Sequence, residues 1–196
     1  MNSKRVVALR ATPLNKCDTY STVHQLKLET ERLALRGYDL DDAERVAELV
    51  GNYEVAKTTQ NIPHPYSLEM AKNWISSHTQ SLNEGDRIAY AILVKDPREL
   101  VGTVSLINIQ ECQASLGYWI GQPYWGKGYC TEAVSAILDY AFAELGIERV
   151  YADHYSNNPA SGKVMAKNGM QYIGQRDAID RNGNIVKINR YEIFNT

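Results

Sequence analysis

Residues 118–130 (Tyr-Trp-Ile-Gly-Gln-Pro-Tyr-Trp-Gly-Lys-Gly-Tyr-Cys) combine an aromatic and β-branched run with two closely spaced glycines, Gly126 and Gly128. An apolar-periodic stretch over residues 131–145 follows and predicts a helix. Glycines let the backbone approach a ligand closely, and the first N–H groups of a helix lack intrahelical partners and lie at the positive end of its dipole. A strand that turns through glycines into a helix is therefore a candidate site for an anionic phosphate.

The remaining periodicity predicts the elements that position this segment. A strand is expected over 26–36, a helix from Asp39 to about residue 50, a loop over 58–66 and a helix over 68–82 capped by Ser67. Two-residue alternation then predicts strands over 88–94, 100–109 and 114–120, followed by the helix over 131–145 and a strand over 149–155. Asn158-Pro159 starts another helix, and Asn182-Gly183 joins a hairpin of residues 171–178 and 185–194.

This order predicts an α/β (mixed α+β) fold, with one mixed sheet and helices on its faces. The one clear parallel crossover runs from strand 114–120 through helix 131–145 to strand 149–155. The length of 196 residues fits one domain. We expect that domain to span residues 25–196, with residues 1–24 as a polar N-terminal extension.

Composition excludes several classes of protein. The chain has 21 Lys and Arg against 23 Asp and Glu, which argues against a nucleic-acid-coating protein. No apolar run approaches the roughly 20 residues of a membrane helix, so no membrane partner is expected. Cys17, Cys112 and Cys130 form neither a disulfide framework nor a zinc pattern, and the histidines form no metal constellation. We therefore expect a reduced, cytoplasmic protein without a metal.

Five segments, in order along the chain, carry a family resemblance. They are Thr30–Arg36, His64–Ser67, Tyr118–Tyr129, Asn158–Ser161 and Val164–Met170. Together they resemble the GNAT superfamily of acyl-CoA-dependent N-acetyltransferases, in particular the RimJ/RimL-type branch that acetylates ribosomal-protein N-termini. The resemblance extends over roughly residues 29–194. Several motifs in the right order are far more specific than one glycine pattern.

The resemblance implies a mostly antiparallel sheet in which strands 114–120 and 149–155 form a central, splayed parallel pair. It implies that acetyl-CoA binds in this splay, with its pantetheine on the strand backbone and its pyrophosphate on the glycine loop. Trp125 stands where this loop usually has Gln or Arg, as is common in the branch. The cofactor-binding residues expected on this basis are Trp119, Ile120, Gly126, Lys127, Gly128, Tyr129, Cys130, Thr131 and Asn158.

The catalytic half departs from better-known relatives. Ser115 stands where many have a general-base Glu, and Met165 stands where many have a general-acid Tyr. The resemblance offers Ser161 as a replacement acid. His154 is a candidate proton relay, although strand alternation can also turn it into the core. Glu111 is a weak candidate for the base, and an exposed loop carboxylate is the better interpretation of it. A dedicated base is not essential, because an α-amino group with a pKa of about 7.7–8.0 is partly neutral at physiological pH.

The resulting hypothesis is direct acetyl transfer from acetyl-CoA, in a ternary complex, to a primary amine. The acceptor is a protein N-terminal α-amine or a small-molecule amine, including an antibiotic, and the protein is a monomer or a homodimer. An alternative is a non-catalytic acyl-CoA-binding or sensing module of the same fold. A nucleotide-binding α/β protein is a third possibility, although the chain lacks the Gly-x-x-x-x-Gly-Lys-Ser/Thr motif.

Overall fold

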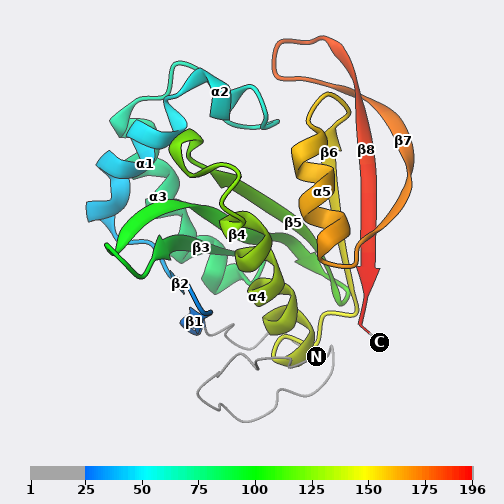
Figure 1. Ribbon diagram of the computed structural model, residues 1–196, viewed down its shortest axis with the longest axis horizontal. Coiled ribbons are helices and arrows are strands. Elements are labelled where there is room, and N and C mark those ends of the chain that lie inside the picture. Colours follow the sequence, from blue (N-terminus) through cyan, green and yellow to red (C-terminus); the bar gives the residue numbers. More distant parts are fainter. Residues whose placement is uncertain (1–24, 196) are drawn as a thin grey trace.

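The computed structural model describes residues 25–195, which form one eight-stranded sheet flanked by helices (Figure 1). The strands are β1 (Leu28–Glu29), β2 (Leu33–Arg36), β3 (Arg87–Val94), β4 (Glu99–Gln110), β5 (Gln113–Ile120), β6 (Arg149–Tyr155), β7 (Gln171–Ile179) and β8 (Ile185–Phe194). The α-helices are α1 (Ala43–Val50), α2 (Tyr53–Ala56), α3 (Leu68–Glu84), α4 (Tyr129–Ala143) and α5 (Pro159–Lys167). Single 3₁₀ turns, η1 (Leu40–Asp42) and η2 (Gln122–Tyr124), precede α1 and α4.

Local chemistry sets the helix ends much as expected. Asp39 forms a capping box at the start of η1, which runs directly into α1. The Ser67 side chain accepts a hydrogen bond from the Met70 N–H and caps α3, and Gly85 ends that helix in the left-handed conformation. These caps explain why the helix expected from residue 68 begins there and why helical structure begins directly after Asp39, whereas α4 begins and ends two residues before the range expected for it.

The helices cover both faces of the sheet, which has the strand order β1-β2-β3-β4-β5-β6-β8-β7. Helices α4 and α5 lie against each other on one face, whereas α1 and α3 pack together on the other (Figure 1). The larger core lies under α4, where Tyr90 of β3 meets Tyr140. A smaller core under α1 and α3 includes Ala91 and Trp119. The sheet thus separates two apolar cores, one on each of its faces.

Strands β5 and β6 form the one parallel pair of this sheet, and they pair over a short distance only. The register joins Gln113–Ser115 to Arg149–Tyr151 and then stops, while β5 continues along β4 and β6 continues along β8. The two strands therefore separate beyond Ser115 and Tyr151. This confirms the expected α/β class with a splayed parallel pair at its centre.

The structure differs from the sequence-based expectations at three places. The strand expected over 26–36 is two short antiparallel strands, because the Thr30 hydroxyl accepts a hydrogen bond from the Leu33 N–H and closes a turn. The short helix α2 was not anticipated. Of the described cysteines Cys130 is free, but Cys112 is disulfide-bonded, so the expectation of reduced cysteines is wrong for Cys112.

The expected extension over residues 1–24 lies outside the described residues. Over residues 25–195, no helix is long and apolar enough to cross a membrane, and no group of His, Cys, Asp and Glu side chains is arranged to hold a metal ion. A cytoplasmic location stays a prediction.

Candidate active site

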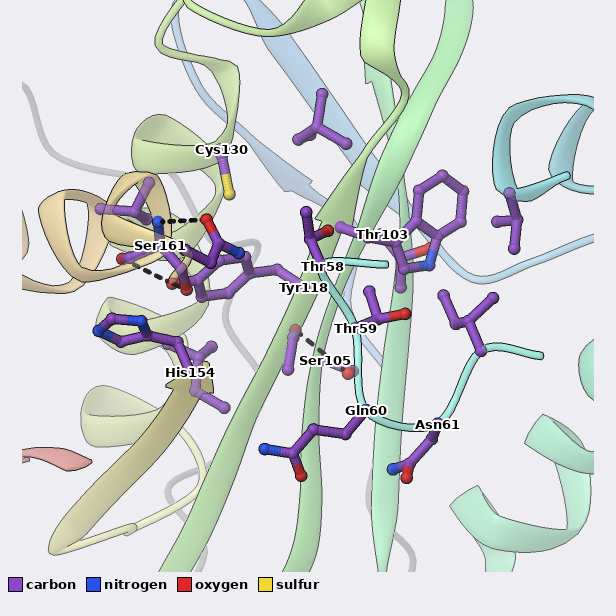
Figure 2. Close-up of a pocket in the computed structure, with 18 of the residues that line it drawn as sticks. Thr58, Thr59, Gln60, Asn61, Thr103, Ser105, Tyr118, Cys130, His154 and Ser161 are labelled. Carbon is purple, nitrogen blue, oxygen red and sulfur yellow. Dashed lines mark hydrogen bonds between the residues drawn. The ribbon is translucent and has the colours of Figure 1, made fainter. Parts of the chain in front are cut away.

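A cavity of about 940 Å³ begins where β5 and β6 separate and extends across the α1/α3 face of the sheet. At one end it reaches the glycine loop before α4, and at the other it reaches α3 and loop 58–63. Figure 2 shows Tyr118, Ser161 and His154 on one side of the cavity and Gln60 and Asn61 of the loop on the opposite side. One continuous cavity therefore joins the predicted phosphate loop to its far end, between α3, loop 58–63 and the sheet.

The glycine loop has the backbone geometry of an anion site. Gly126 and Gly128 have φ angles of 76° and 81°, and Gly128 is the N-cap of α4 without a side-chain cap. The first intrahelical bond of α4 is donated by Glu132 to the Gly128 carbonyl, and within residues 25–195 the N–H groups of 126–131 donate no hydrogen bond. A Cβ built on Gly126 would meet nothing within 4 Å. The N–H groups are thus unpaired beside open space.

Two side chains hold this loop in place. Arg32 donates to the Glu132 carboxylate (Nε–Oε2, 2.7 Å) and to the Lys127 carbonyl (Nη1–O, 2.9 Å). Trp125 donates its indole N–H to the Ile120 carbonyl at 2.6 Å, which ties the loop to the end of β5. The Glu132 carboxylate is neutralised by Arg32 and leaves the loop without an uncompensated negative charge. The residue that departs from the usual loop pattern, Trp125, therefore has a structural role.

Tyr118 and Ser161 connect β5 to α5 across the gap between β5 and β6. The Tyr118 phenol oxygen lies 2.8 Å from Ser161 Oγ and donates to the Ser161 carbonyl at 3.1 Å (Figure 2). Burial raises the pKa of Tyr118 well above its usual value, so the phenol stays protonated. Asn158 holds Ser161 in place, since its side-chain oxygen accepts from the Ser161 N–H at the start of α5. Sequence reasoning identified Ser161 but missed Tyr118 as its partner.

His154 lines the cavity from β6 and is only 5% exposed. Its Nδ1 lies 2.8 Å from the Tyr155 carbonyl, which can only accept, so Nδ1 carries the proton. Its Nε2 is buried without a hydrogen-bond partner and lies close to Gly162 of α5. Nε2 is therefore left as an acceptor without a donor. His154 is both buried and part of the cavity lining, so the structure contains elements of both alternatives, a core residue and a site residue.

Asp153 supplies the one carboxylate among the described residues that line the cavity, and sequence reasoning missed it. Its Oδ2 lies 3.1 Å from Arg176 Nη2, and its Oδ1 lies 3.5 Å from Arg190 Nε. The strand alternation that turns His154 towards α5 turns Asp153 to the opposite face of the sheet, a signal that was available in the β6 sequence.

The other positions discussed for catalysis are placed as follows. Ser115 lines the cavity, and Met165 is 2% exposed in the core, where it has no proton to give. Glu111 lies in the turn between β4 and β5 with a φ of 48°, and the structure does not bring it to the cavity.

Most of the predicted cofactor residues border the cavity. These are Trp119, Ile120, Gly126, Gly128, Tyr129, Cys130, Thr131 and Asn158. Lys127 is exposed outside this lining, and its Nζ lies 5.2 Å from the centre of the Tyr124 ring. Burial raises the pKa of the Cys130 thiol to about 12, so the thiol is protonated and a poor nucleophile at neutral pH.

At its far end, the cavity is bounded on one side by small residues of the sheet and on the other side by polar side chains of loop 58–63. Ala89, Ser105 and Gly117 stand side by side on β3, β4 and β5. Loop 58–63 lines the opposite wall with hydroxyl and amide groups. Arg181, in the β7–β8 turn, donates to the carbonyls of Ala56 and Ile62 and so ties the hairpin to this loop.

The splayed parallel strand pair beside an unpaired helix N-terminus is the arrangement that the GNAT resemblance implies. Residues 32–171 match the model described as "Acetyltransferase (GNAT) domain", so the chain belongs to the GNAT acetyltransferase family, and it is an N-acetyltransferase. The RimJ/RimL-type resemblance is confirmed as well.

Three known proteins illustrate the relationship. The uncharacterized N-acetyltransferase p20 of Bacillus licheniformis is 30% identical over 170 residues, which cover 85% of this chain and 95% of p20. The [ribosomal protein uS5]-alanine N-acetyltransferase of Escherichia coli (strain K12) is 27% identical over 165 residues, 79% of this chain and 82% of that enzyme. The structure of RimL, the ribosomal L7/L12 alpha-N-protein acetyltransferase in complex with coenzyme A, has a TM-score of 0.77 at 20% identity and covers 84% of this chain and 95% of RimL.

Proposed function

We propose that this protein transfers an acetyl group from acetyl-CoA directly to a primary amine. The observation that carries the proposal is the continuity of the cavity, in which the phosphate-binding loop and the far end meet at the gap between β5 and β6. RimL was solved with coenzyme A, and the E. coli relative acts on the alanine of ribosomal protein uS5. Both support an amine acceptor and a CoA donor here.

The residues present fit the donor. The unpaired N–H groups of residues 126–131 suit a pyrophosphate, and exposed Lys163 and Lys167 of α5 add positive charge to the same wall. The β5 edge beyond Ser115 has no strand partner and suits an extended pantetheine. Acetyl-CoA, when bound, supplies an acetyl group activated as a thioester.

Side chains in the cavity can stabilise the leaving thiolate and accept a proton from the amine. The hydrogen-bonded Tyr118–Ser161 pair lies at the gap and can donate a hydrogen bond to a leaving thiolate, since burial raises the pKa of Tyr118 and the phenol stays protonated. His154 and Asp153 of β6 both line the cavity and carry the atoms that could accept a proton, namely the unpartnered Nε2 of His154 and the carboxylate of Asp153. The cavity itself provides proximity by holding donor and acceptor together.

Direct transfer is favoured over a covalent acyl-enzyme. Cys130 is the one thiol among the described cavity residues, and burial keeps it protonated. The serine hydroxyls have no base as partner: Ser161 contacts Tyr118, and Ser105 donates to the Gly117 carbonyl. The geometry therefore lacks an activated nucleophile.

The test is to incubate the pure protein with acetyl-CoA and a panel of peptides and small amines, and to follow release of the CoA thiol. We expect acceptor-dependent release with ternary-complex kinetics, in which both substrates must be bound before either product leaves. Tight CoA binding without release for any acceptor would favour the non-catalytic module instead. Parallel lines in double-reciprocal plots would contradict direct transfer.

A further inference from the structure

Arg87, the first residue of β3, lines the far end of the cavity, where the proposed amine acceptor would bind, and it has no hydrogen-bond or ion-pair partner among residues 25–195. Its Nε is buried without a hydrogen bond, and it forms no ion pair. Every other arginine between residues 25 and 195 has a carboxylate or carbonyl partner, except the exposed Arg98. An arginine that is half-buried and unpaired is unusual, because guanidinium groups taken from water need acceptors.

The sheet register fixes where the Arg87 backbone lies. Arg87 stands opposite Ile107 on β4, which stands opposite Ser115 on β5, so the three side chains share one face of the sheet. Ser115 is the last β5 residue paired with β6 and borders the gap where the acetyl group is expected. Two strand spacings separate β3 from β5, so the Arg87 backbone lies about 10 Å from that of Ser115.

Among residues 25–195, no carboxylate forms an ion pair with Arg87. The walls of this end of the cavity are neutral, with Gln60, Asn61 and Asn73 among the polar groups. Burial, together with the charge of Arg87, lowers the pKa of His78 to about 4, so His78 is neutral at pH 7. The one cavity carboxylate among the described residues, Asp153, is paired with two other arginines on the far side of the gap.

We propose that Arg87 binds an anionic group of the acceptor, so that the acceptor is an amine that also carries a carboxylate or phosphate about 10 Å from its nitrogen. This inference rests on the proposed function. Charge-assisted hydrogen bonds from a guanidinium to such an anion are strong and directional. A span of about 10 Å corresponds to roughly three peptide residues, or to a six-carbon chain ending in phosphate.

The experiment measures binding of two matched pairs of amines to the protein saturated with CoA, by quenching of the fluorescence of Trp74 and Trp119, which line the cavity. One pair is Ser-Ala-Glu-amide and Ser-Ala-Gln-amide, and the other is 6-aminohexyl phosphate and 6-aminohexanol. In at least one pair, we expect the amine that carries the carboxylate or phosphate to bind about tenfold or more tightly than the matched amine without it. The pair that discriminates reveals whether the anion is an acidic side chain or a phosphate.

The variant Arg87→Gln should reduce that preference to less than about twofold while leaving CoA affinity unchanged, which also shows that the variant is folded. Arg98→Gln, which makes the same change in net charge at an exposed turn, should keep the preference. Arg87→Glu should make Ser-Ala-Lys-amide bind better than Ser-Ala-Glu-amide. Equal binding within both pairs, a preference that survives in Arg87→Gln, or no binding of any probe would overturn the inference.

Acetyl transfer, followed in parallel, separates the two proposals. An Arg87-dependent binding preference without transfer to any amine would refute the proposed function and leave the anion subsite standing. Efficient transfer to neutral amines without any effect of Arg87→Gln would do the reverse.

Discussion

The phenol oxygen of Tyr118 lies 2.8 Å from the hydroxyl oxygen of Ser161, and this contact joins β5 to α5 across the gap between β5 and β6. If the pair stabilises the leaving thiolate by donating hydrogen bonds, Ser161→Ala and Tyr118→Phe should each lower kcat by about tenfold to a hundredfold. KM for acetyl-CoA should change far less. Because the two hydroxyls act as one unit, the double variant should be little slower than the worse single variant.

Ser105→Ala is the matched control for this pair, since Ser105 lies in the same cavity but donates to the Gly117 carbonyl instead. Its kcat should stay within about twofold of the kcat of the unmodified protein, because a substitution away from the reacting groups has a small effect. An unaltered kcat in Ser161→Ala, or fully additive losses in the double variant, would remove the pair from the mechanism.

Gly128→Val tests the phosphate loop. A side chain at Gly128 would sit at a φ of 81° and within 3.3 Å of an Arg32 nitrogen, so it should crowd the loop and cost about 1–2 kcal/mol of stability. Gly146→Val carries the same kind of backbone strain, at a φ of 65°, beyond the other end of α4. Both should lower Tm, but only Gly128→Val should weaken CoA binding, by tenfold or more, in a calorimetric titration. Equal CoA affinities in the two variants would contradict the loop assignment.

Glu132 should make stability depend on pH. Although burial alone would raise its pKa, hydrogen bonds from Thr30 and Arg32 outweigh that effect and lower it below 4.5. A lowered carboxylate pKa contributes stability that is present above the unfolded value and is lost as pH falls through the folded value. Glu132→Gln should therefore cost roughly 1 kcal/mol at pH 7 and clearly less at pH 3. Urea unfolding at both pH values measures this difference, and a cost that persists in full at pH 3 would show that charge is not its cause.

Arg181→Ala should loosen the acceptor side alone. Arg181 donates to two carbonyls of the chain around loop 58–63, so its loss frees the wall that faces the acceptor. We expect KM for the amine to rise about threefold to tenfold, on the scale of one or two lost hydrogen bonds, with CoA affinity unchanged. Lys187→Ala, which breaks an exposed ion pair with Asp177 on the same hairpin, should leave both constants alone. A parallel rise in the CoA dissociation constant would mean that the hairpin supports the whole cavity.

Most of the fold could be predicted from local signals. Three helical segments begin after side chains that cap them through hydrogen bonds within three residues, namely Asp39, Ser67 and Asn158. The range of β6, 149–155, follows from the alternation of apolar and polar residues. The errors occurred where tertiary contacts decide, as in the turn at Thr30 that divides one expected strand into β1 and β2. Its neighbour Arg32 is held by Glu132, which lies 100 residues further along the chain.

The donor half of the proposed site was predicted from the sequence alone. Unpaired N–H groups next to glycines of positive φ are a property of a few consecutive residues, so the local pattern around Gly126 and Gly128 indicates an anion loop. The acceptor half was decided by the tertiary structure. Only sheet pairing brings Arg87 into line with Ser115, and only the separation of β5 from β6 leaves Tyr118 free to reach Ser161. No local pattern encodes contacts between residues so far apart in the chain, because their side chains meet only after the sheet has formed.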